Sequence, residues 1–146
     1  QGDALVCEQV AQLDSKDMDH ATWQALAQRC AHWLAQPDVG GIVITHGPDT
    51  LEETAWFLQQ VRETPKAVVL TCSMRPATAL TPDGPQNLLD AMAVVRDPMA
   101  RGVLAVCAGT QGTIIRDTSS PARTSLRIEI VLFMDLPPGE SMGFGV

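Results

Sequence analysis

The chain has 146 residues, of which 45% are hydrophobic and 18% are charged. This length fits a domain with its own hydrophobic core, and the composition is ordinary for a soluble globular protein. The net charge of −7 argues against a nucleic-acid partner or an anionic membrane surface, because both require clustered Lys and Arg. No apolar run reaches the roughly 20 residues of a transmembrane helix, so we expect no membrane partner.

The cysteine pattern indicates thiols rather than disulfides. Cys7, Cys30, Cys72 and Cys107 lie in apolar runs and show no C-x-x-C spacing, which favours buried, reduced side chains. No His, Cys or acidic residues have the spacing of metal ligands, so we expect neither a metal nor a cofactor. Reduced cysteines favour a cytoplasmic protein, and a periplasmic location stays open if a signal peptide precedes Gln1.

Strand and helix patterns alternate along the first three quarters of the chain. The mixed apolar run Ala4 to Leu13 precedes a helix pattern for which Asp19 or Thr22 is the candidate cap. The run Gly41 to Thr45 is short, β-branched and apolar, as in a strand covered on both faces. The apolar residues that define the helix pattern after Leu13 are Trp23, Leu26, Ala27, Cys30 and Leu34.

Two further helices and two further strands follow. Thr50-Leu51-Glu52-Glu53 has the pattern of a capping box, in which a hydroxyl and a carboxylate satisfy backbone amides reciprocally. Lys66 to Cys72 and Gly102 to Cys107 read as buried strands, and Asp83-Gly84-Pro85 reads as a turn into a helix. We expect the buried helix faces to carry Leu51, Ala55, Leu58 and Val61, and then Leu88, Met92 and Val95.

This order predicts an α/β fold of three layers, a mostly parallel sheet with helices on both faces. Residues 1–146 are expected to form a single domain. The pattern weakens after Ala108, where Gln111 to Ser125 has no clear period. Arg127 to Met134 looks like a strand of mixed polarity, and we expect the Pro- and Gly-containing tail Leu136 to Val146 to be poorly ordered.

The turn after the strand Gly41 to Thr45 is the leading candidate for a site. Asp49 lies at the start of a helix, whose positive end favours the ionised carboxylate. Open α/β folds bind ligands at the carboxyl ends of their strands, so Asp49 suits a cationic amino group, with hydroxyls of Thr45, Thr50 and Thr54 nearby. The same pattern fits a simple helix cap, and both interpretations stay open. His46 fits a hydrogen-bonded structural histidine better than a general base.

The stretch Thr45-His46-Gly47-Pro48-Asp49-Thr50-Leu51-Glu52-Glu53-Thr54 closely resembles the second signature of the bacterial L-asparaginase family. The resemblance extends in order over about residues 6–107, to the family's large amino-terminal domain, while 108–146 are diverged or irregular. It implies the flavodoxin-like or Rossmann-like fold of that domain in incomplete form. The supporting stretches are Gln9 to Met18, Val68 to Pro76, Thr81 to Leu88 and Arg101 to Val106.

The resemblance also implies a function. Members hydrolyse the side-chain amide of asparagine, and often glutamine, to the acid and ammonia through a threonine nucleophile. It implies a homo-oligomer with sites at subunit contacts and a small-molecule amino-acid substrate. By resemblance, Ser15 holds the α-carboxylate of the substrate with Lys16 beside it, and Asp49 holds its α-amino group. Ser73 stands where the backbone faces the reacting carbonyl.

The catalytic residues of the family are only partly present. Pro48 occupies the position of the catalytic Thr and Ser120 that of the Lys, so Asp49 alone survives from the Thr-Asp-Lys set. We therefore expect this chain to be catalytically incomplete. We expect an incomplete or locally altered sequence for three reasons: it starts late relative to the family's amino-terminal domain, it carries these two replacements, and it is changed after Ala108. Two alternatives are a non-catalytic amino-acid-binding homologue and an asparaginase-like subunit of a tRNA-dependent amidotransferase.

Overall fold

The computed structural model describes residues 3–106, 108–109, 113–114 and 126–135. Its main strands are β1 (Asp3–Leu13), β2 (Val39–Thr45), β3 (Ala67–Thr71), β4 (Val103–Val106) and β7 (Leu126–Asp135). Its helices are η1 (Ser15–Asp17, one 3₁₀ turn), α1 (His20–Leu34), α2 (Leu51–Val61) and α3 (Gly84–Arg96). Two short strands, β5 (Ala108–Gly109) and β6 (Thr113–Ile114), form a separate pair.

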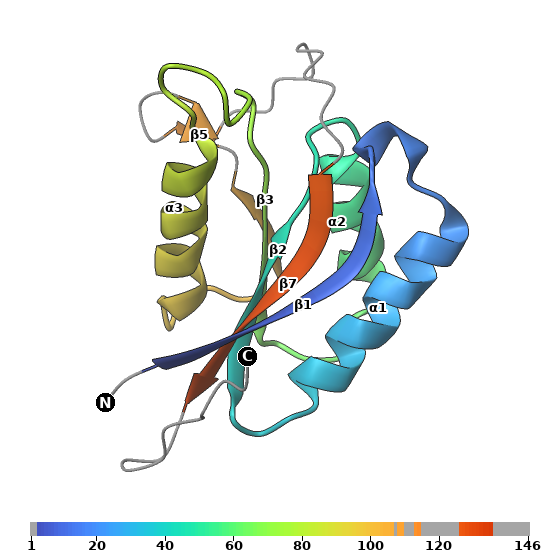
Figure 1. Cartoon of the computed structure of the whole chain (residues 1–146). Coiled ribbons are helices and arrows are strands. Elements are labelled where there is room, and N and C mark those ends of the chain that lie inside the picture. The colour runs from blue at the N-terminus through green and yellow to red at the C-terminus, as the bar shows by residue number, and fades with distance from the viewer. Residues whose placement is uncertain (1–2, 107, 110–112, 115–125, 136–146) are drawn as a thin grey trace, which may run out of the picture.

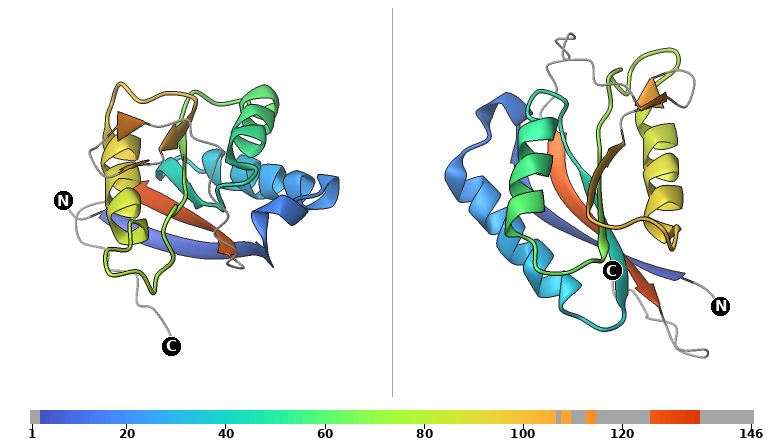
Figure 2. Two further views of the ribbon diagram at one scale, coloured as in Figure 1. Left: turned by 90° about the horizontal axis from the view of Figure 1, so that it is seen from above. Right: turned by 180° about the vertical axis from the view of Figure 1, so that it is seen from behind.

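The predicted three-layer α/β fold is confirmed. The sheet has the order β1-β7-β2-β3-β4, with α1 and α2 on one face and α3 on the other (Figures 1 and 2). β2, β3 and β4 pair in parallel, whereas β7 lies antiparallel between β1 and β2. Since β7 is antiparallel to both neighbours, β1 runs in the same direction as β2. The expected strand at Arg127 to Met134 is therefore present, although its place inside the sheet was not predicted.

Helix α1 begins as its sequence indicates. The carboxylate of Asp19 accepts a hydrogen bond from the backbone amide of Thr22 at 2.8 Å, so Asp19 is the cap. Leu26, Cys30 and Leu34 are buried at a spacing of four residues, which turns one stripe of the helix toward the sheet. Each leucine buried in this way stabilises the fold by about 2 kcal/mol.

Helix α2 departs from prediction at its cap and at its last turn. The Thr50 side chain makes no capping hydrogen bond, so the predicted capping box is wrong. Its hydroxyl instead donates to the backbone carbonyl of Ser15 at 2.7 Å. Leu51 and Leu58 are buried as expected, but Thr54 shares their face, Ala55 is only half-buried, and Val61 is 46% exposed because the helix ends there.

Helix α3 buries smaller side chains than the sequence pattern predicts. Asn87 and Ala91 are buried with Val95, while the predicted core residues Leu88 and Met92 are half-buried at its edges. A Cβ on Gly41 of β2 would lie 2.6 Å from Cγ2 of Val95, so glycine is needed for this approach. Ala91, which has a small side chain, is fully buried on the same helix. The predicted face is thus rotated by about one residue.

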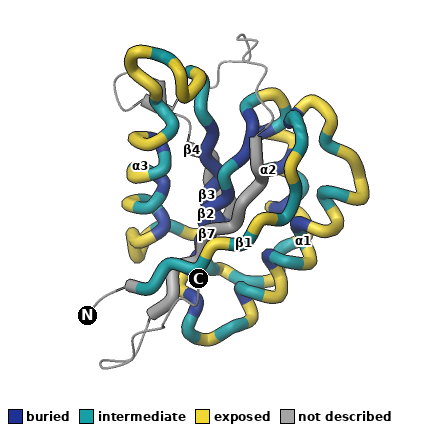
Figure 3. The backbone as a smooth tube through the Cα atoms, in the orientation of Figure 1, coloured by how far each residue is buried: buried dark blue, intermediate teal, exposed yellow. Residues whose placement is uncertain are grey.

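The central strands are buried (Figure 3), and two clusters of hydrophobic side chains form the core on their two faces. Ile42, Ile44, Val68 and Leu70 face α1 and α2, whereas Val43 and Val69 face α3. Every residue of β3 is buried, as predicted for a strand covered on both faces.

The cysteine prediction is partly wrong. Cys30 and Cys72 are buried, but Cys7 is exposed, because β1 is an edge strand and α3 packs mainly over β2, β3 and β4. Burial raises the pKa of the Cys30 thiol to about 12, so this side chain stays protonated. Cys107, Ser120, most of Gln111 to Ser125 and the tail Leu136 to Val146 lie outside the described residues.

Candidate functional site

The candidate site lies at the carboxyl edge of the sheet, where β1, β2 and β3 end. Ser15 follows β1, the segment His46 to Thr50 connects β2 to α2, and Ser73 lies just beyond β3. A hydrogen bond from the backbone amide of His46 to the carbonyl of Thr71, at 2.9 Å, joins two of these strand ends. The predicted site residues therefore come from three segments that the sheet brings to one edge, as is usual for ligand sites of this fold class.

Ser15 and the β2–α2 turn interlock. Ser15 is 5% exposed, and its Oγ accepts a hydrogen bond from the backbone amide of Asp49 at 3.2 Å. The Thr50 hydroxyl donates to the carbonyl of the same serine, so two adjacent turn residues are tied to one point. The backbone of Gly47 packs directly against Ser15, since a Cβ there would lie 2.5 Å from the serine Cβ.

The Asp49 side chain is presented to solvent. Asp49 is exposed and lies two residues before α2. Its amide is occupied by Ser15, which fixes the backbone and leaves the carboxylate at the surface. A carboxylate held in this way suits a cationic ligand group. The structure thus brings two of the predicted substrate-binding residues, Ser15 and Asp49, into direct contact.

Lys16 is engaged with its own neighbours. Its ammonium lies 2.7 Å from a carboxylate oxygen of Asp17 and 3.2 Å from one of Asp14. Hydrogen bonds to Asp17 and then to Asp14 raise the pKa of Lys16, so the side chain stays cationic. Any ligand carboxylate at this lysine therefore competes with two carboxylates of the chain itself.

Ser73 belongs to a separate cluster around Asp83. The Asp83 carboxylate accepts hydrogen bonds from the Ser73 hydroxyl at 2.8 Å and from the amides of Met74 and Arg75 at 3.0 and 2.9 Å. Burial opposes ionisation of Asp83, but these hydrogen bonds together hold its pKa below the usual range. The Ser73 side chain is thus committed to shaping its loop, and only its backbone remains available to a ligand.

His46 is buried beneath the turn, with 2% of its surface exposed. Its Nδ1 lies 2.7 Å from the carbonyl of Gly47, and its Nε2 lies 2.9 Å from the Thr54 hydroxyl. Burial lowers the pKa of His46, although its contact with Gly47 acts in the opposite direction. This arrangement agrees with the structural histidine favoured from sequence, and it places His46 away from the surface where a ligand would bind.

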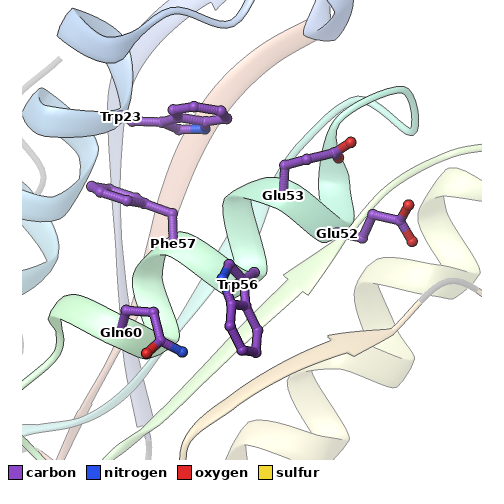
Figure 4. A pocket seen from close by; sticks show the side chains of 6 residues that line it. All are labelled: Trp23, Glu52, Glu53, Trp56, Phe57 and Gln60. Carbon is purple, nitrogen blue, oxygen red and sulfur yellow. The ribbon is translucent and has the colours of Figure 1, made fainter.

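A shallow depression of about 470 Å³ lies on the outer side of α2 (Figure 4). None of the predicted site residues lines it. Trp56 stands in it 69% exposed, and the Trp23 and Phe57 rings stack nearby with centroids 5.8 Å apart. Its lining residues are Trp23, Glu52, Glu53, Trp56, Phe57 and Gln60.

In the part of the chain that the structure describes, no group of three or more His, Cys, Asp or Glu side chains is placed to hold a metal ion. Over the same residues, no helix is both long enough and apolar enough to cross a membrane.

Comparison with known proteins agrees with these features. Residues 2–127 match the family described as "Asparaginase, N-terminal". The L-asparaginase 2 of Bacillus subtilis (strain 168) is 48% identical over 95 residues, which are 65% of this chain and 25% of that protein. The glutaminase-asparaginase of Pseudomonas fluorescens biotype A is 47% identical over 95 residues, 65% of this chain and 26% of that protein. The chain belongs to the asparaginase family.

A solved structure of the asparaginase family has the same fold. The probable cytoplasmic L-asparaginase from Campylobacter jejuni matches with a TM-score of 0.66 and 44% identity, over 68% of this chain and 31% of that chain. The present chain therefore spans about a quarter to a third of the length of these asparaginases.

The asparaginase signature carries its main departure at the tip of the turn. Pro48 is half-buried, and its carbonyl accepts a hydrogen bond from the amide of Leu51 at 3.5 Å. Proline has no hydroxyl and no backbone donor, so it offers a reacting substrate neither a nucleophile nor an N–H. Ser120 lies outside the described residues, and its relation to this turn stays a prediction.

Sequence reasoning missed how the turn is supported. The sequence predicts that the Thr54 hydroxyl lies near Asp49, but Thr54 is fully buried and its hydroxyl is hydrogen-bonded to His46. The sequence predicts that Trp23 belongs to the apolar face of its helix, yet its indole N–H also donates a hydrogen bond to the Thr54 hydroxyl, 31 positions away in the chain, at 2.8 Å. The sequence offered one signal, a threonine at the spacing of the apolar residues Leu51 and Leu58 of α2, and this spacing does not reveal the partners of Thr54.

Proposed function

We propose that Ser15 and Asp49 form the amino-acid-binding part of an asparaginase-type amidohydrolase site. One observation carries the proposal. The Ser15 hydroxyl is buried and accepts from the Asp49 amide, but no described residue accepts its proton. A buried donor without an acceptor is unfavourable, and a ligand carboxylate at this point satisfies it. The Asp49 carboxylate beside it complements a cationic amino group.

The two groups match the two charges of an α-amino acid. In the proposed complex, the Ser15 hydroxyl donates to the α-carboxylate, and Asp49 accepts from the α-ammonium group. Lys16, the residue after Ser15, adds positive charge near the α-carboxylate of the ligand, although its ammonium group also pairs with Asp14 and Asp17. Ser73 takes part through its backbone, because its hydroxyl is bonded to Asp83. No cofactor is required for this binding.

The proposed reaction is hydrolysis of the side-chain amide of asparagine, with glutamine as a second substrate. A threonine hydroxyl attacks the amide carbonyl, ammonia leaves, and water releases the acid from the acyl intermediate. The names of the relatives, L-asparaginase and glutaminase-asparaginase, support this substrate class. Because Pro48 supplies no nucleophile, the chain as it stands contributes recognition of the amino acid and not the covalent step.

A non-catalytic amino-acid-binding protein is the second candidate. Pro48 favours it, since the loss of a nucleophile leaves the contacts of Ser15 and Asp49 intact. Both candidates require amino-acid binding, and they differ in whether ammonia is released.

Location and assembly are further parts of the proposal. The name of the Campylobacter jejuni structure supports a cytoplasmic protein. The resemblance to the family supports a homo-oligomer, and the exposed Trp56 ring is a surface of the kind that subunit contacts cover.

Isothermal titration calorimetry with L-aspartate tests the binding proposal. We expect binding of L-aspartate at millimolar concentration and none of succinate, which lacks the α-amino group. Asp49→Asn should weaken binding about tenfold or more, because a hydrogen bond to a charged group is lost. Asp90→Asn, on the far helix α3, is the matched control and should bind as the parent does. Equal heats for L-aspartate and succinate, or an unaffected Asp49→Asn variant, would contradict the proposal.

A further inference from the structure

Three side chains from three different elements form a continuous hydrogen-bond chain beneath the candidate site. The indole Nε1 of Trp23 on α1 lies 2.8 Å from the Thr54 hydroxyl on α2. That hydroxyl lies 2.9 Å from Nε2 of His46, at the end of β2. The other ring nitrogen of His46 lies 2.7 Å from the carbonyl of Gly47, inside the β2–α2 turn. Thr54 and His46 are almost completely buried.

The partners fix the direction of each hydrogen bond. The Gly47 carbonyl only accepts, so Nδ1 of His46 must carry a proton and donate it. The indole N–H of Trp23 only donates, so Thr54 accepts from it. The Thr54 hydroxyl is then free to donate to Nε2 of a neutral His46. Every group in this Trp23–Thr54–His46 chain is satisfied in one arrangement, which specifies one tautomer of the imidazole.

The hydrogen-bond chain ends at the carbonyl of Gly47, the residue that packs against Ser15. Gly47 touches Ser15 directly, and Asp49, two residues later, donates its amide to the Ser15 hydroxyl. The turn is therefore held both by its contacts with Ser15 and by the hydrogen bond between His46 and the Gly47 carbonyl. A shift of the Gly47 carbonyl changes the position of both groups proposed to bind the amino acid.

We propose that Trp23, Thr54 and His46 are positioning residues, which hold the Gly47–Asp49 turn in the geometry that presents Ser15 and Asp49 to an amino-acid ligand. The inference rests on the proposed binding function, but the geometry of the turn can be measured without a ligand. None of the three side chains touches the ligand in this scheme. Their effect is transmitted through the backbone of the turn.

Thr54→Val and Thr54→Ser separate the hydroxyl from the bulk of the side chain. Valine keeps the shape and leaves Trp23 and His46 without their shared partner, whereas serine keeps the hydroxyl. Thr71→Val is the matched control, because Thr71 is also buried at a strand end but its hydroxyl makes only a long hydrogen bond, 3.4 Å, to Asn87. Trp23→Phe removes the first donor and leaves the Thr54–His46 bond in place.

Three quantities are measured on each variant: hydrogen exchange of the Asp49 amide, the ¹⁵N shifts of the His46 ring, and the affinity for L-aspartate. Thr54→Val should speed exchange of this amide about tenfold, weaken binding about tenfold and change the His46 ring shifts, as expected for a lost buried hydrogen bond. Thr54→Ser should restore all three toward the parent values, and Thr71→Val should leave them unchanged. Trp23→Phe should have a smaller effect in the same direction.

The outcomes distinguish the two proposals. If the parent does not bind L-aspartate, the proposed function fails, and the positioning role is decided by amide exchange and the His46 signals. If Thr54→Val retains parental exchange at Asp49 and parental ring shifts, the positioning role is overturned whatever the affinity. Equal losses in Thr54→Val and Thr71→Val would also overturn it, because they would indicate general destabilisation.

Discussion

The backbone amide of Asp49 donates a hydrogen bond to the hydroxyl of Ser15 at 3.2 Å, across 34 positions of sequence. The contact joins the end of β1 to the start of α2, and Thr50 strengthens it by donating to the carbonyl of Ser15. Two residues that we propose to share one binding site are thereby held together before any ligand arrives. Such preorganisation lowers the entropy that a ligand must otherwise overcome.

Gly47→Ala should separate these two residues. The new Cβ would lie 2.5 Å from the Cβ of Ser15, so either the turn or the 3₁₀ helix η1 must move. We expect a loss of about 1–3 kcal/mol in the free energy of unfolding, the usual cost of overpacking, together with loss of L-aspartate binding. Urea denaturation and calorimetry measure both effects.

Gly84→Ala is the control for this prediction. Its Cβ would lie 3.5 Å from Ser73, an ordinary contact, and the fold should tolerate it. If Gly47→Ala were as stable as Gly84→Ala, the close packing of Gly47 on Ser15 would be refuted.

Asp83→Asn should destabilise the loop after β3. The ionised carboxylate accepts from Ser73, Met74 and Arg75, and replacing it by an amide should cost about 2 kcal/mol at neutral pH. Because the folded-state pKa of Asp83 is lowered from its ordinary 3.8, its stabilisation is present above that value and is lost as the pH falls through the lowered pKa.

The pH dependence identifies the carboxylate as the cause. The stability difference between parent and Asp83→Asn should therefore shrink at pH below about 3.8. A difference that stays constant with pH would show that the charge of Asp83 is not what stabilises the loop. Thermal unfolding followed by circular dichroism gives these values.

His46 should make the fold sensitive to mild acid. Burial lowers its folded-state pKa from 6.5, so below pH 6.5 the unfolded chain binds a proton at this histidine more readily than the folded chain does. The stabilisation is complete above pH 6.5 and declines as the pH falls toward the lowered pKa, by up to about 1.4 kcal/mol per pH unit. Glu53 acts against this shift but does not reverse it.

Unfolding free energies measured at several pH values test this dependence. His46→Gln should abolish this part of the slope, and the exposed His32→Gln should retain it. A parent slope that survives in His46→Gln would assign the effect to another group.

Pro48→Thr should not create an active enzyme. The substitution restores a hydroxyl at the tip of the turn, but Ser120 still stands where the family has its lysine, so the hydroxyl lacks this activating group. In an ammonia-release assay with L-asparagine, we expect no activity from the parent or from Pro48→Thr. Activity in Pro48→Thr alone would show that Pro48 is the sole defect, and activity in the parent would refute the assignment of the nucleophile.

The sequence predicted elements well where a local pattern decides the structure. Apolar runs identified β2 and β3, and Asp19 was one of two candidate caps for α1. Prediction from the sequence failed where a contact with a distant segment decides the local structure. Thr50 has the local pattern of a cap, yet its hydroxyl bonds to Ser15 because the end of β1 lies beside it.

The same reason limited the prediction of the sheet and of the site. The residues Arg127 to Met134 predict a strand, which the structure shows as Leu126–Asp135, but strand order depends on long-range pairing, which no local period encodes. For the site, family resemblance named Ser15 and Asp49, whereas their support by Trp23, Thr54 and His46 became visible only when three elements were placed in space.

Titration of the ¹⁵N-labelled chain with L-aspartate, followed by amide resonances, tests most directly whether Ser15 and Asp49 form an amino-acid site. The account predicts that the amides of Ser15, Lys16 and Asp49 shift together in a saturable manner and that those of α3 do not. In Asp49→Asn, the same shifts should require about tenfold more L-aspartate or more. Saturable shifts confined to the depression at Trp56, or no shift of the Asp49 amide at all, would contradict it.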